Sequence, residues 1–192
     1  MSALDAHGGW SALISRLIAG DDLPGNVAGD ALTEILTGDA TPAQIAGFVV
    51  ALRAKGESVE ELSGLLAAAM AEASIVPLTD AEREVAVDVV GTGGDGSDSV
   101  NVSTMAAIVV AAAGATVCKH GNRSASSRTG AADVLEMLGV SLDLTPDGVA
   151  TCVREAGIGF CLATKFHPAF RYAGGPRREM GVPTVFNLLG PM

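Results

Sequence analysis

The sequence predicts an α/β protein in which an N-terminal helical domain, residues 1–76, precedes an α/β domain built on a parallel sheet. Apolar residues recur at helical spacing in the first part, whereas from Val85 onward short strand-like apolar runs alternate with helical stretches. Strands that alternate with helices are typical of a parallel sheet with right-handed crossovers. With 192 residues and 48% apolar content, the chain can form one domain or two small ones around a real core.

The helical domain is expected to contain about four helices and no strand. Residues 13–18 carry apolar side chains at helical spacing. Thr41 followed by Pro42 predicts a helix start, because threonine is a good N-cap and proline fits the first helical position. Ser58 with Glu61 three residues later is a capping box, which predicts another helix start.

The α/β domain is expected over residues 85–173, after a linker at 76–84. The predicted strands are residues 85–90, 115–118, 140–144 and 158–162. The helices between them are expected to end at the glycines Gly114, Gly139 and Gly157. Beyond residue 162 the pattern weakens, and residues 163–181 are expected to line a crevice or to return to the helical domain.

The net charge of −10 argues against a nucleic-acid partner and against an anionic membrane surface, because both require a basic protein surface. Most lysines and arginines lie in the second half of the chain, so a local positive pocket is expected there. Cys118, Cys152 and Cys161 are odd in number and lack metal-binding spacing, which argues against a disulfide framework. With no signal-peptide pattern at the N-terminus, we expect a cytoplasmic protein.

Two polar loops are expected to bind phosphate. The first joins a predicted strand to an Ala-rich helix and has glycines at positions 91, 93, 94 and 96. Glycine lets the backbone approach a ligand, and backbone N–H groups at a helix N-terminus attract phosphate. The second loop, residues 119–127, follows the next predicted strand. Loops at the carboxyl ends of neighbouring parallel strands converge on one crevice, so the pair is expected to bind one ligand.

The first loop also fits the G-x-G-x-x-G pattern of dinucleotide-binding folds, with glycines at 91, 93 and 96. That pattern calls for an acidic residue about 20 residues further on, which binds the ribose. This chain has Lys119 and His120 after the second strand instead. An NADP-binding oxidoreductase, with the 2′-phosphate on Lys119 or Arg123, is therefore an alternative.

Four motifs occur together: residues 91–95 with 101–104, residues 119–123, residues 166–168, and residues 177–179 leading into 184–191. In this order and spacing they resemble the N-terminal half of the anthranilate phosphoribosyltransferase family, which belongs to glycosyltransferase family 3 and the nucleoside phosphorylase type II superfamily. The resemblance runs from about Trp10 to the last residue. It implies that residues 174–192 return to the helical domain and that the protein is a homodimer.

The resemblance implies transfer of the phosphoribosyl group from 5-phosphoribosyl 1-diphosphate to anthranilate, a step of tryptophan biosynthesis that releases diphosphate. No covalent nucleophile is needed, so no catalytic residue is expected, and positioning and electrostatic stabilisation carry the reaction. Mg²⁺ is the implied cofactor, with Ser103 as the implied ligand. One hydroxyl is a reasonable contribution, because Mg²⁺ keeps phosphate and water ligands.

The resemblance also implies the substrate contacts. The donor contacts are Gly91, Gly94, Asp95, Ser99, Asn101, Val102, Ser103, Thr104, Lys119, His120, Gly121, Asn122, Arg123, Ser124, Ala125, Ser126, Ser127 and Ala131. The anthranilate contacts are Gly91, Asn122, His167 and Arg177. A guanidinium suits the anthranilate carboxylate, because it forms two parallel hydrogen bonds with it. Helix capping alone would explain Asn101 and Ser103 equally well.

The chain departs from the family pattern at Ala163-Thr164, where the family usually has Ala-Pro. The difference concerns the tunnel that receives the acceptor, anthranilate, in that family. The family pattern continues for nearly as long again and includes an adjacent Asp-Glu pair that holds Mg²⁺, which these 192 residues lack. We therefore expect an incomplete sheet with an exposed edge, poor solubility and little activity of this chain alone. A pyrimidine nucleoside phosphorylase and a non-catalytic phosphate-binding protein are further alternatives.

Overall fold

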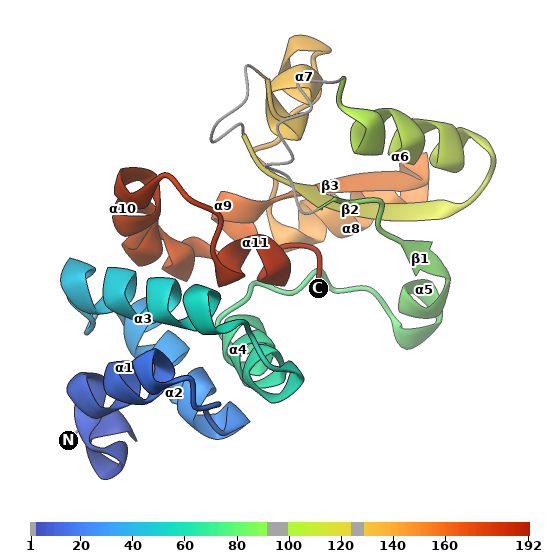
Figure 1. The fold of residues 1–192 in the computed structure, drawn as a ribbon. Helices are drawn as coiled ribbons and strands as arrows, with labels where there is room; N and C mark the ends of the chain where they lie inside the picture. The colour runs from blue at the N-terminus through green and yellow to red at the C-terminus, as the bar shows by residue number, and fades with distance from the viewer. Residues whose placement is uncertain (1–2, 92–99, 124–128) are drawn as a thin grey trace. The chain divides into compact units, whose positions relative to one another are not determined.

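The computed structural model describes residues 3–91, 100–123 and 129–192, which form two compact units (Figure 1). The first unit contains residues up to 73 together with residues 169–192, and the second contains residues 74–168. The chain thus leaves the first unit and returns to it. Within the described residues, no helix is long and apolar enough to cross a membrane.

The first unit is helical throughout the part that the structure describes. Its elements are η1 (Ala3–His7), α1 (Gly9–Ala19), α2 (Gly25–Thr37), α3 (Pro42–Lys55), α4 (Val59–Ala71), α10 (Arg171–Met180) and α11 (Val185–Leu189). The predicted helix starts are confirmed: Thr41 and Ser58 each form a capping box with the residue three positions on. Such a box satisfies two backbone N–H groups that would otherwise lack a partner at the helix start.

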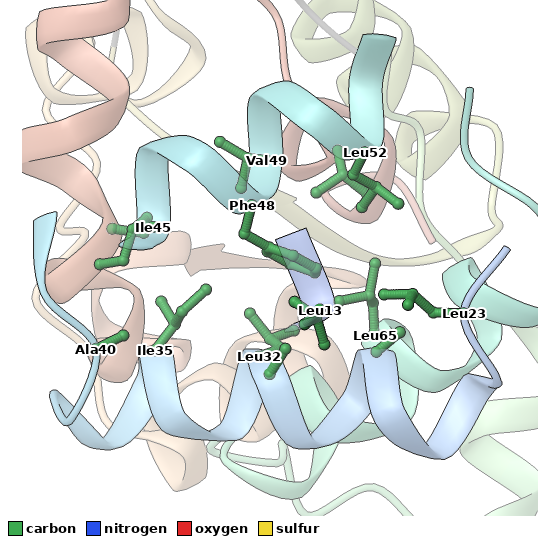
Figure 2. Packing of buried hydrophobic residues seen from close by; sticks show 14 of the residues in the cluster. Leu13, Leu23, Leu32, Ile35, Ala40, Ile45, Phe48, Val49, Leu52 and Leu65 are labelled. Atoms are coloured by element: carbon green, nitrogen blue, oxygen red, sulfur yellow. The ribbon is translucent and has the colours of Figure 1, made fainter. Parts of the chain in front are cut away.

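The core of the first unit lies between its helices (Figure 2). Leu13 of α1, Leu32 of α2, Phe48 of α3 and Leu65 of α4 are all fully buried in one apolar cluster. The ring of Trp10 packs edge-on against Phe48, with 5.9 Å between the ring centroids. Burial of this apolar surface is the main term that stabilises the unit.

Helices α2 and α4 approach each other closely because glycines lie where they cross. A Cβ atom on Gly64 would lie 1.8 Å from the carbonyl oxygen of Gly25, which is far inside van der Waals contact. At Gly29 a Cβ atom would lie 3.0 Å from the carbonyl oxygen of Gly64. Any side chain at Gly64 would therefore force the two helices apart.

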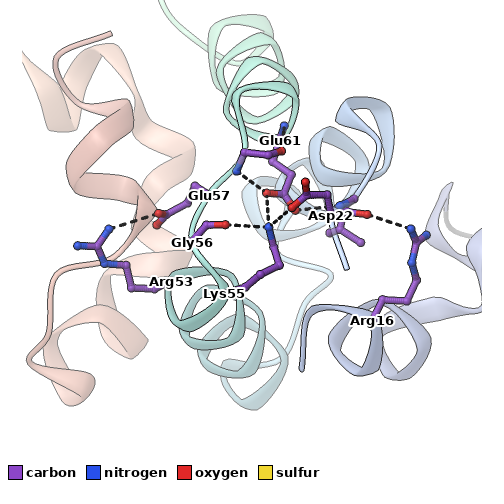
Figure 3. Close-up of polar contacts among 9 residues, drawn as sticks. Arg16, Asp22, Arg53, Lys55, Gly56, Glu57 and Glu61 are labelled. Carbon is purple, nitrogen blue, oxygen red and sulfur yellow. Dashed lines mark hydrogen bonds and ion pairs between the residues drawn. The ribbon is translucent and has the colours of Figure 1, made fainter. Parts of the chain in front are cut away.

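A buried carboxylate joins three segments of the first unit (Figure 3). Glu61 is 0% exposed and accepts hydrogen bonds from the backbone N–H of Leu23 at 2.9 Å and of Ser58 at 2.8 Å. It also pairs with Lys55 at 3.0 Å, and Lys55 pairs in turn with Asp22 at 2.5 Å. Burial disfavours the lysine charge, but the bonds to Asp22 and Glu61 outweigh it and raise the pKa of Lys55 above its ordinary value.

The second unit has the α/β architecture. Its elements are α5 (Asp80–Val85), β1 (Ala86–Val87), α6 (Val102–Ala112), β2 (Thr116–Gly121), α7 (Ala131–Met137), α8 (Pro146–Ala156), β3 (Ile158–Leu162) and α9 (Ala163–Phe166). The turn η2 (Pro168–Phe170) contains the boundary between the units. The three strands form a parallel sheet in the order β1-β2-β3, which confirms the predicted fold class.

Helices cover both faces of this sheet. Cys161 of β3 packs in one cluster with Val149 and Val153 of α8. Phe160 and Leu162, on the alternate positions of β3, pack in another cluster with α7. Because successive side chains of a strand point to opposite faces, α8 and α7 lie on opposite faces of the sheet.

Two strand predictions are corrected. The run predicted as a strand over 85–90 contains only the two strand residues of β1, because Val85 ends helix α5, which begins within the expected linker. Thr79 and Glu82 form the capping box of α5, so the start of this helix is also marked by a pattern in the sequence. Residues 140–144 are not a strand: Leu142 is buried, but Val140 is 42% exposed and no strand of the described sheet pairs with them.

A further prediction is corrected. Lys119, His120 and Gly121 were expected in a loop, but they belong to β2, because β3 extends far enough to pair with them. Residues 163–181, for which no helix was predicted, form α9, η2 and α10. The three cysteines are free in the structure, where Cys161 is buried and Cys118 and Cys152 are half-buried.

Candidate functional site

The carboxyl ends of β1 and β2 bring together the described parts of the two predicted phosphate-binding loops. The predicted contacts Gly94, Asp95, Ser99, Ser124, Ala125, Ser126 and Ser127 lie outside the described residues. Gly91, at the start of the first loop, has no heavy atom within 4 Å of a Cβ built on it among the described residues. Its backbone is thus open to close approach by a ligand.

Lys119 is the buried cation of this region. Only 2% of the residue is exposed, and its Nζ donates hydrogen bonds to the carbonyl oxygen of Val89 at 2.6 Å and to Ser103 Oγ at 3.5 Å. Burial lowers the pKa of Lys119 below its ordinary value, while the charge of Asp88 acts in the opposite direction. Lys119 thereby connects β2 with the end of β1 and with α6.

His120 contacts an acidic residue at the end of β1. The backbone N–H of His120 donates to Asp88 Oδ1 at 3.3 Å, and the ring Nδ1 pairs with Asp88 Oδ2. Asp88 was not among the predicted site residues. The signal was nevertheless present, because Asp88 is the one charged residue in the apolar run 85–90.

The N-terminus of α6 presents polar groups. Asn101 occupies the N-cap position but makes no side-chain capping bond, so capping does not account for its side chain. Val102 and Ser103 form the first turn, and Thr104 is 2% exposed with an Oγ1 atom that has no hydrogen-bond partner among the described residues. Buried hydroxyls usually have a partner, so this oxygen is a candidate ligand contact.

The second loop is tied to α7. Asn122 accepts a hydrogen bond from the backbone N–H of Arg123 at 2.8 Å. The guanidinium of Arg123 pairs with both carboxylate oxygens of Glu136 at 2.5 Å and with Asp133 at 3.4 Å. The hydrogen bonds to Glu136 raise the pKa of Arg123 above its ordinary value. Arg123 is therefore paired with carboxylates in this structure.

Gly121 lies where the strand passes close to other groups. A Cβ atom on Gly121 would lie 3.0 Å from the ring of Phe160 and 3.3 Å from Cβ of Ala131. The carbonyl oxygen of Asn122 accepts a hydrogen bond from Ala132, so the strand end rests on the start of α7. This contact positions the loop that carries Asn122 and Arg123.

The predicted anthranilate contacts His167 and Arg177 belong to different compact units. His167 directly follows α9, and its pKa is lowered by burial and, to a smaller extent, by the nearby His120. Arg177 lies in α10, where its guanidinium is 4.9 Å from the ring centroid of Phe186 and burial lowers its pKa. Among the described residues no carboxylate lies within ion-pair distance of Arg177, so its charge is available to an anion.

The described residues offer few ligands for a metal ion. Residues 3–91, 100–123 and 129–192 contain no cluster of three or more His, Cys, Asp or Glu side chains that would hold one. The hydroxyl of Ser103 also has the Lys119 ammonium beside it. This environment suits a cation that a phosphate ligand brings with it better than one held by the protein alone.

The architecture of the described residues, a helical unit and a parallel-sheet α/β unit, agrees with two domain models of a glycosyl transferase family. The model of the glycosyl transferase family helical bundle domain matches residues 11–74, and the model of the family a/b domain matches residues 83–192. The chain therefore belongs to this family.

Curated relatives at 57% and 58% identity are anthranilate phosphoribosyltransferases, from Saccharopolyspora erythraea and Salinispora arenicola. The matches cover 96% and 95% of this chain but 52% of each relative, so the chain spans about half their length.

Solved structures agree with these matches. An anthranilate phosphoribosyltransferase from Thermus thermophilus superposes with a TM-score of 0.86 at 43% identity, over 93% of this chain and 54% of that one. The Saccharomyces cerevisiae enzyme in complex with PRPP and Mg gives a TM-score of 0.84 at 30% identity, over 96% and 54%. The same yeast enzyme in complex with 4-fluoroanthranilate gives 0.78 at 28% identity, over 96% and 52%.

Proposed function

We propose that this chain carries the substrate-binding loops of an anthranilate phosphoribosyltransferase. The reaction transfers the phosphoribosyl group from 5-phosphoribosyl 1-diphosphate to the amine of anthranilate and releases diphosphate. The observation that supports this most is the position of Lys119, a buried cation that joins the ends of both phosphate-binding loops. The relatives' substrates support the choice of donor and acceptor over a dinucleotide.

In this proposal the donor is bound by electrostatic and main-chain contacts. The open backbone at Gly91 and the N-terminus of α6 face the phosphates, and Thr104 and Asn101 supply side-chain hydrogen bonds. Lys119 stabilises the negative charge that grows on the leaving diphosphate. Because Lys119 is buried, its charge acts on the ligand with little screening by solvent.

The acceptor is oriented by its carboxylate. Arg177 forms the paired hydrogen bonds with that group, and the ring of Phe186 supports the guanidinium from one side. Gly91, Asn122 and His167 are the other proposed contacts of anthranilate. With both substrates held, the amine attacks C1 as the bond to diphosphate breaks, and the protein contributes mainly by positioning.

Mg²⁺ is the proposed cofactor, since the yeast relative was solved with PRPP and Mg. When bound, it neutralises charge on the diphosphate. Ser103 is the proposed protein ligand, with the remaining ligands coming mainly from phosphate and water. A homodimeric assembly and a cytoplasmic location are further parts of this proposal.

The test is product formation. We would incubate the chain with both substrates and Mg²⁺, alone and fused to the half of the Saccharopolyspora erythraea relative that it does not match, and detect phosphoribosyl anthranilate by mass spectrometry. The fusion should form product, and Lys119→Met in the same fusion should reduce it at least about a hundredfold. A folded fusion that forms no product would contradict the proposal.

A further inference from the structure

The ends of β1 and β2 are connected chiefly by side chains. The strands pair at two positions only, Ala86 with Thr116 and Val87 with Val117. Strand β2 then runs on to Gly121, whereas β1 has ended. Over this stretch the contacts between the two segments that the structure describes are those of Lys119 with Val89 and of His120 with Asp88.

Asp88 holds His120 at two points. One carboxylate oxygen accepts from the backbone N–H of His120 at 3.3 Å, and the other pairs with ring Nδ1. An ionised carboxylate can only accept hydrogen bonds, so Nδ1 must carry the proton. In the neutral ring, the lone pair is then on Nε2. The two-point contact also fixes the rotation of the ring.

We propose that Asp88 is a positioning residue that fixes the tautomer and the orientation of the His120 ring, so that Nε2 is presented to substrate. This inference rests on the proposed function, with His120 among the donor contacts that the family resemblance implies. A carboxylate behind a histidine performs this task in other sites, where it selects the tautomer and the ring orientation.

The exposure of the pair supports a role in binding. The side chains of His120 and Asp88 are 32% and 30% exposed. A partly exposed pair of this kind contributes little to stability, so stability alone is a weak reason for it. The partial exposure also leaves the ring accessible to a ligand.

The position of His120 on β2 separates it from Lys119. Successive residues of a strand face opposite sides, and Lys119 faces α6, where it contacts Ser103. His120 shares the other face with Cys118.

His120 has three described neighbours with which it interacts electrostatically, namely Asp88, Cys118 and His167. Two imidazoles, His120 and His167, therefore lie close enough to influence each other in the second unit.

The tautomer can be read directly, because the chain has only three histidines, His7, His120 and His167. Nitrogen-15 NMR of the histidine rings would be assigned with His7→Gln and His167→Gln. We expect the proton of His120 on Nδ1 in the unmodified protein. In Asp88→Asn the amide oxygen keeps the backbone N–H, the amide NH₂ then faces Nδ1, and the proton should move to Nε2. An unchanged His120 spectrum would overturn the inference.

Calorimetry then tests the consequence for substrate. With 5-phosphoribosyl 1-diphosphate plus Mg²⁺, and separately with anthranilate, Asp88→Asn should weaken binding of at least one substrate about tenfold. Asp88→Ala, which frees the ring, should weaken the same substrate. The matched control is Asp143→Asn, which breaks the exposed pair with Lys165 in the same unit and should change neither affinity nor tautomer.

A double variant separates an indirect from a direct effect. If Asp88 acts through His120, Asp88→Asn with His120→Gln should lose no more affinity than His120→Gln alone. Additive losses, or a changed tautomer without any loss of affinity, would overturn the positioning role. If the unmodified protein binds neither substrate, both the proposed function and the substrate-presenting role are wrong, and the NMR result alone decides whether Asp88 sets the tautomer.

Discussion

The guanidinium of Arg177 lies 4.9 Å from the ring centroid of Phe186, and no carboxylate among the described residues pairs with it. A desolvated arginine with an aromatic ring on one side and no internal anion is suited to bind a planar carboxylate from outside.

Arg177→Ala should therefore raise the KM for anthranilate far more than the KM for the donor. The lost charge-assisted pair is worth about 1.5–3 kcal/mol, or roughly ten- to a hundredfold in kcat/KM for anthranilate. Steady-state kinetics in the fusion described above would measure this. The control is Arg178→Ala, which removes an exposed neighbouring charge. Equal losses for both substrates would show that Arg177 does not bind the acceptor.

Glu136 pairs with Arg123, a proposed donor contact, so Glu136→Gln should tighten donor binding. Arg123 must exchange its carboxylate partners for phosphate oxygens, and removal of the competing charge makes this exchange easier. Because the pair is exposed, the gain should be modest, up to about fivefold in Kd. Calorimetry with the donor and Mg²⁺ would measure it, with Glu155→Gln as an exposed control on α8. Weaker binding in Glu136→Gln would mean that the pair positions Arg123 productively.

Glu61 should be essential for the stability of the first unit. Glu61→Ala removes one of the two carboxylates that pair with Lys55, so that Asp22 remains, and it leaves the backbone N–H groups of Leu23 and Ser58 unpaired. The expected loss is about 3–5 kcal/mol in the free energy of unfolding. Chemical denaturation would measure it. Glu60→Ala, an exposed neighbour with one hydrogen bond to Gly25, should cost less than about 1 kcal/mol.

Glu82 should contribute to stability in a pH-dependent way. Hydrogen bonds from Arg154 lower the pKa of Glu82 from 4.5 to about 2. A carboxylate whose pKa is lower in the folded state stabilises that state above its unfolded pKa, and the contribution disappears as the pH falls from about 4.5 to about 2.

Glu82→Gln should thus lower the unfolding temperature by roughly one to three degrees at pH 7 and leave it unchanged near pH 2. Calorimetry across this range would test the prediction, with Glu84→Gln as the control on the same helix. A difference that persists undiminished at pH 2 would assign the effect to something other than the charge of Glu82.

Sequence patterns predicted the features that depend on neighbouring residues. The helix starts at Thr41 and Ser58 follow from groups three positions apart, and the fold class follows from the alternation of strands and helices. Residues 140–144 show why strands are harder to predict: apolar residues alternate with polar ones in the sequence, but a strand also needs a partner, and sequence periodicity does not reveal one. Helix α10 was missed because Gly174, Gly175 and Pro176 have low helix propensity, which tertiary packing overrides here.

The same distinction between local patterns and long-range contacts applies to the candidate site. Lys119 and Ser103 could be identified in the sequence as parts of local motifs, and the structure places Lys119 Nζ 3.5 Å from Ser103 Oγ. The contacts of Asp88 with His120 and of Glu136 with Arg123 could not be identified in this way, because they join residues 32 and 13 positions apart. Such pairings depend on the strand order and on the register, which are properties of the folded sheet.

The shortness of β1 has a consequence for the energetics of binding. With two paired residues, this strand has few backbone hydrogen bonds to lose, so its detachment from β2 should be a low-energy local opening that hydrogen exchange would detect. A ligand that contacts both strand ends binds only the closed form, so its apparent affinity is reduced by the fraction of molecules that are open. The amide groups of residues 86–88 should consequently exchange more slowly once the ligand is bound, even though the ligand need not touch them.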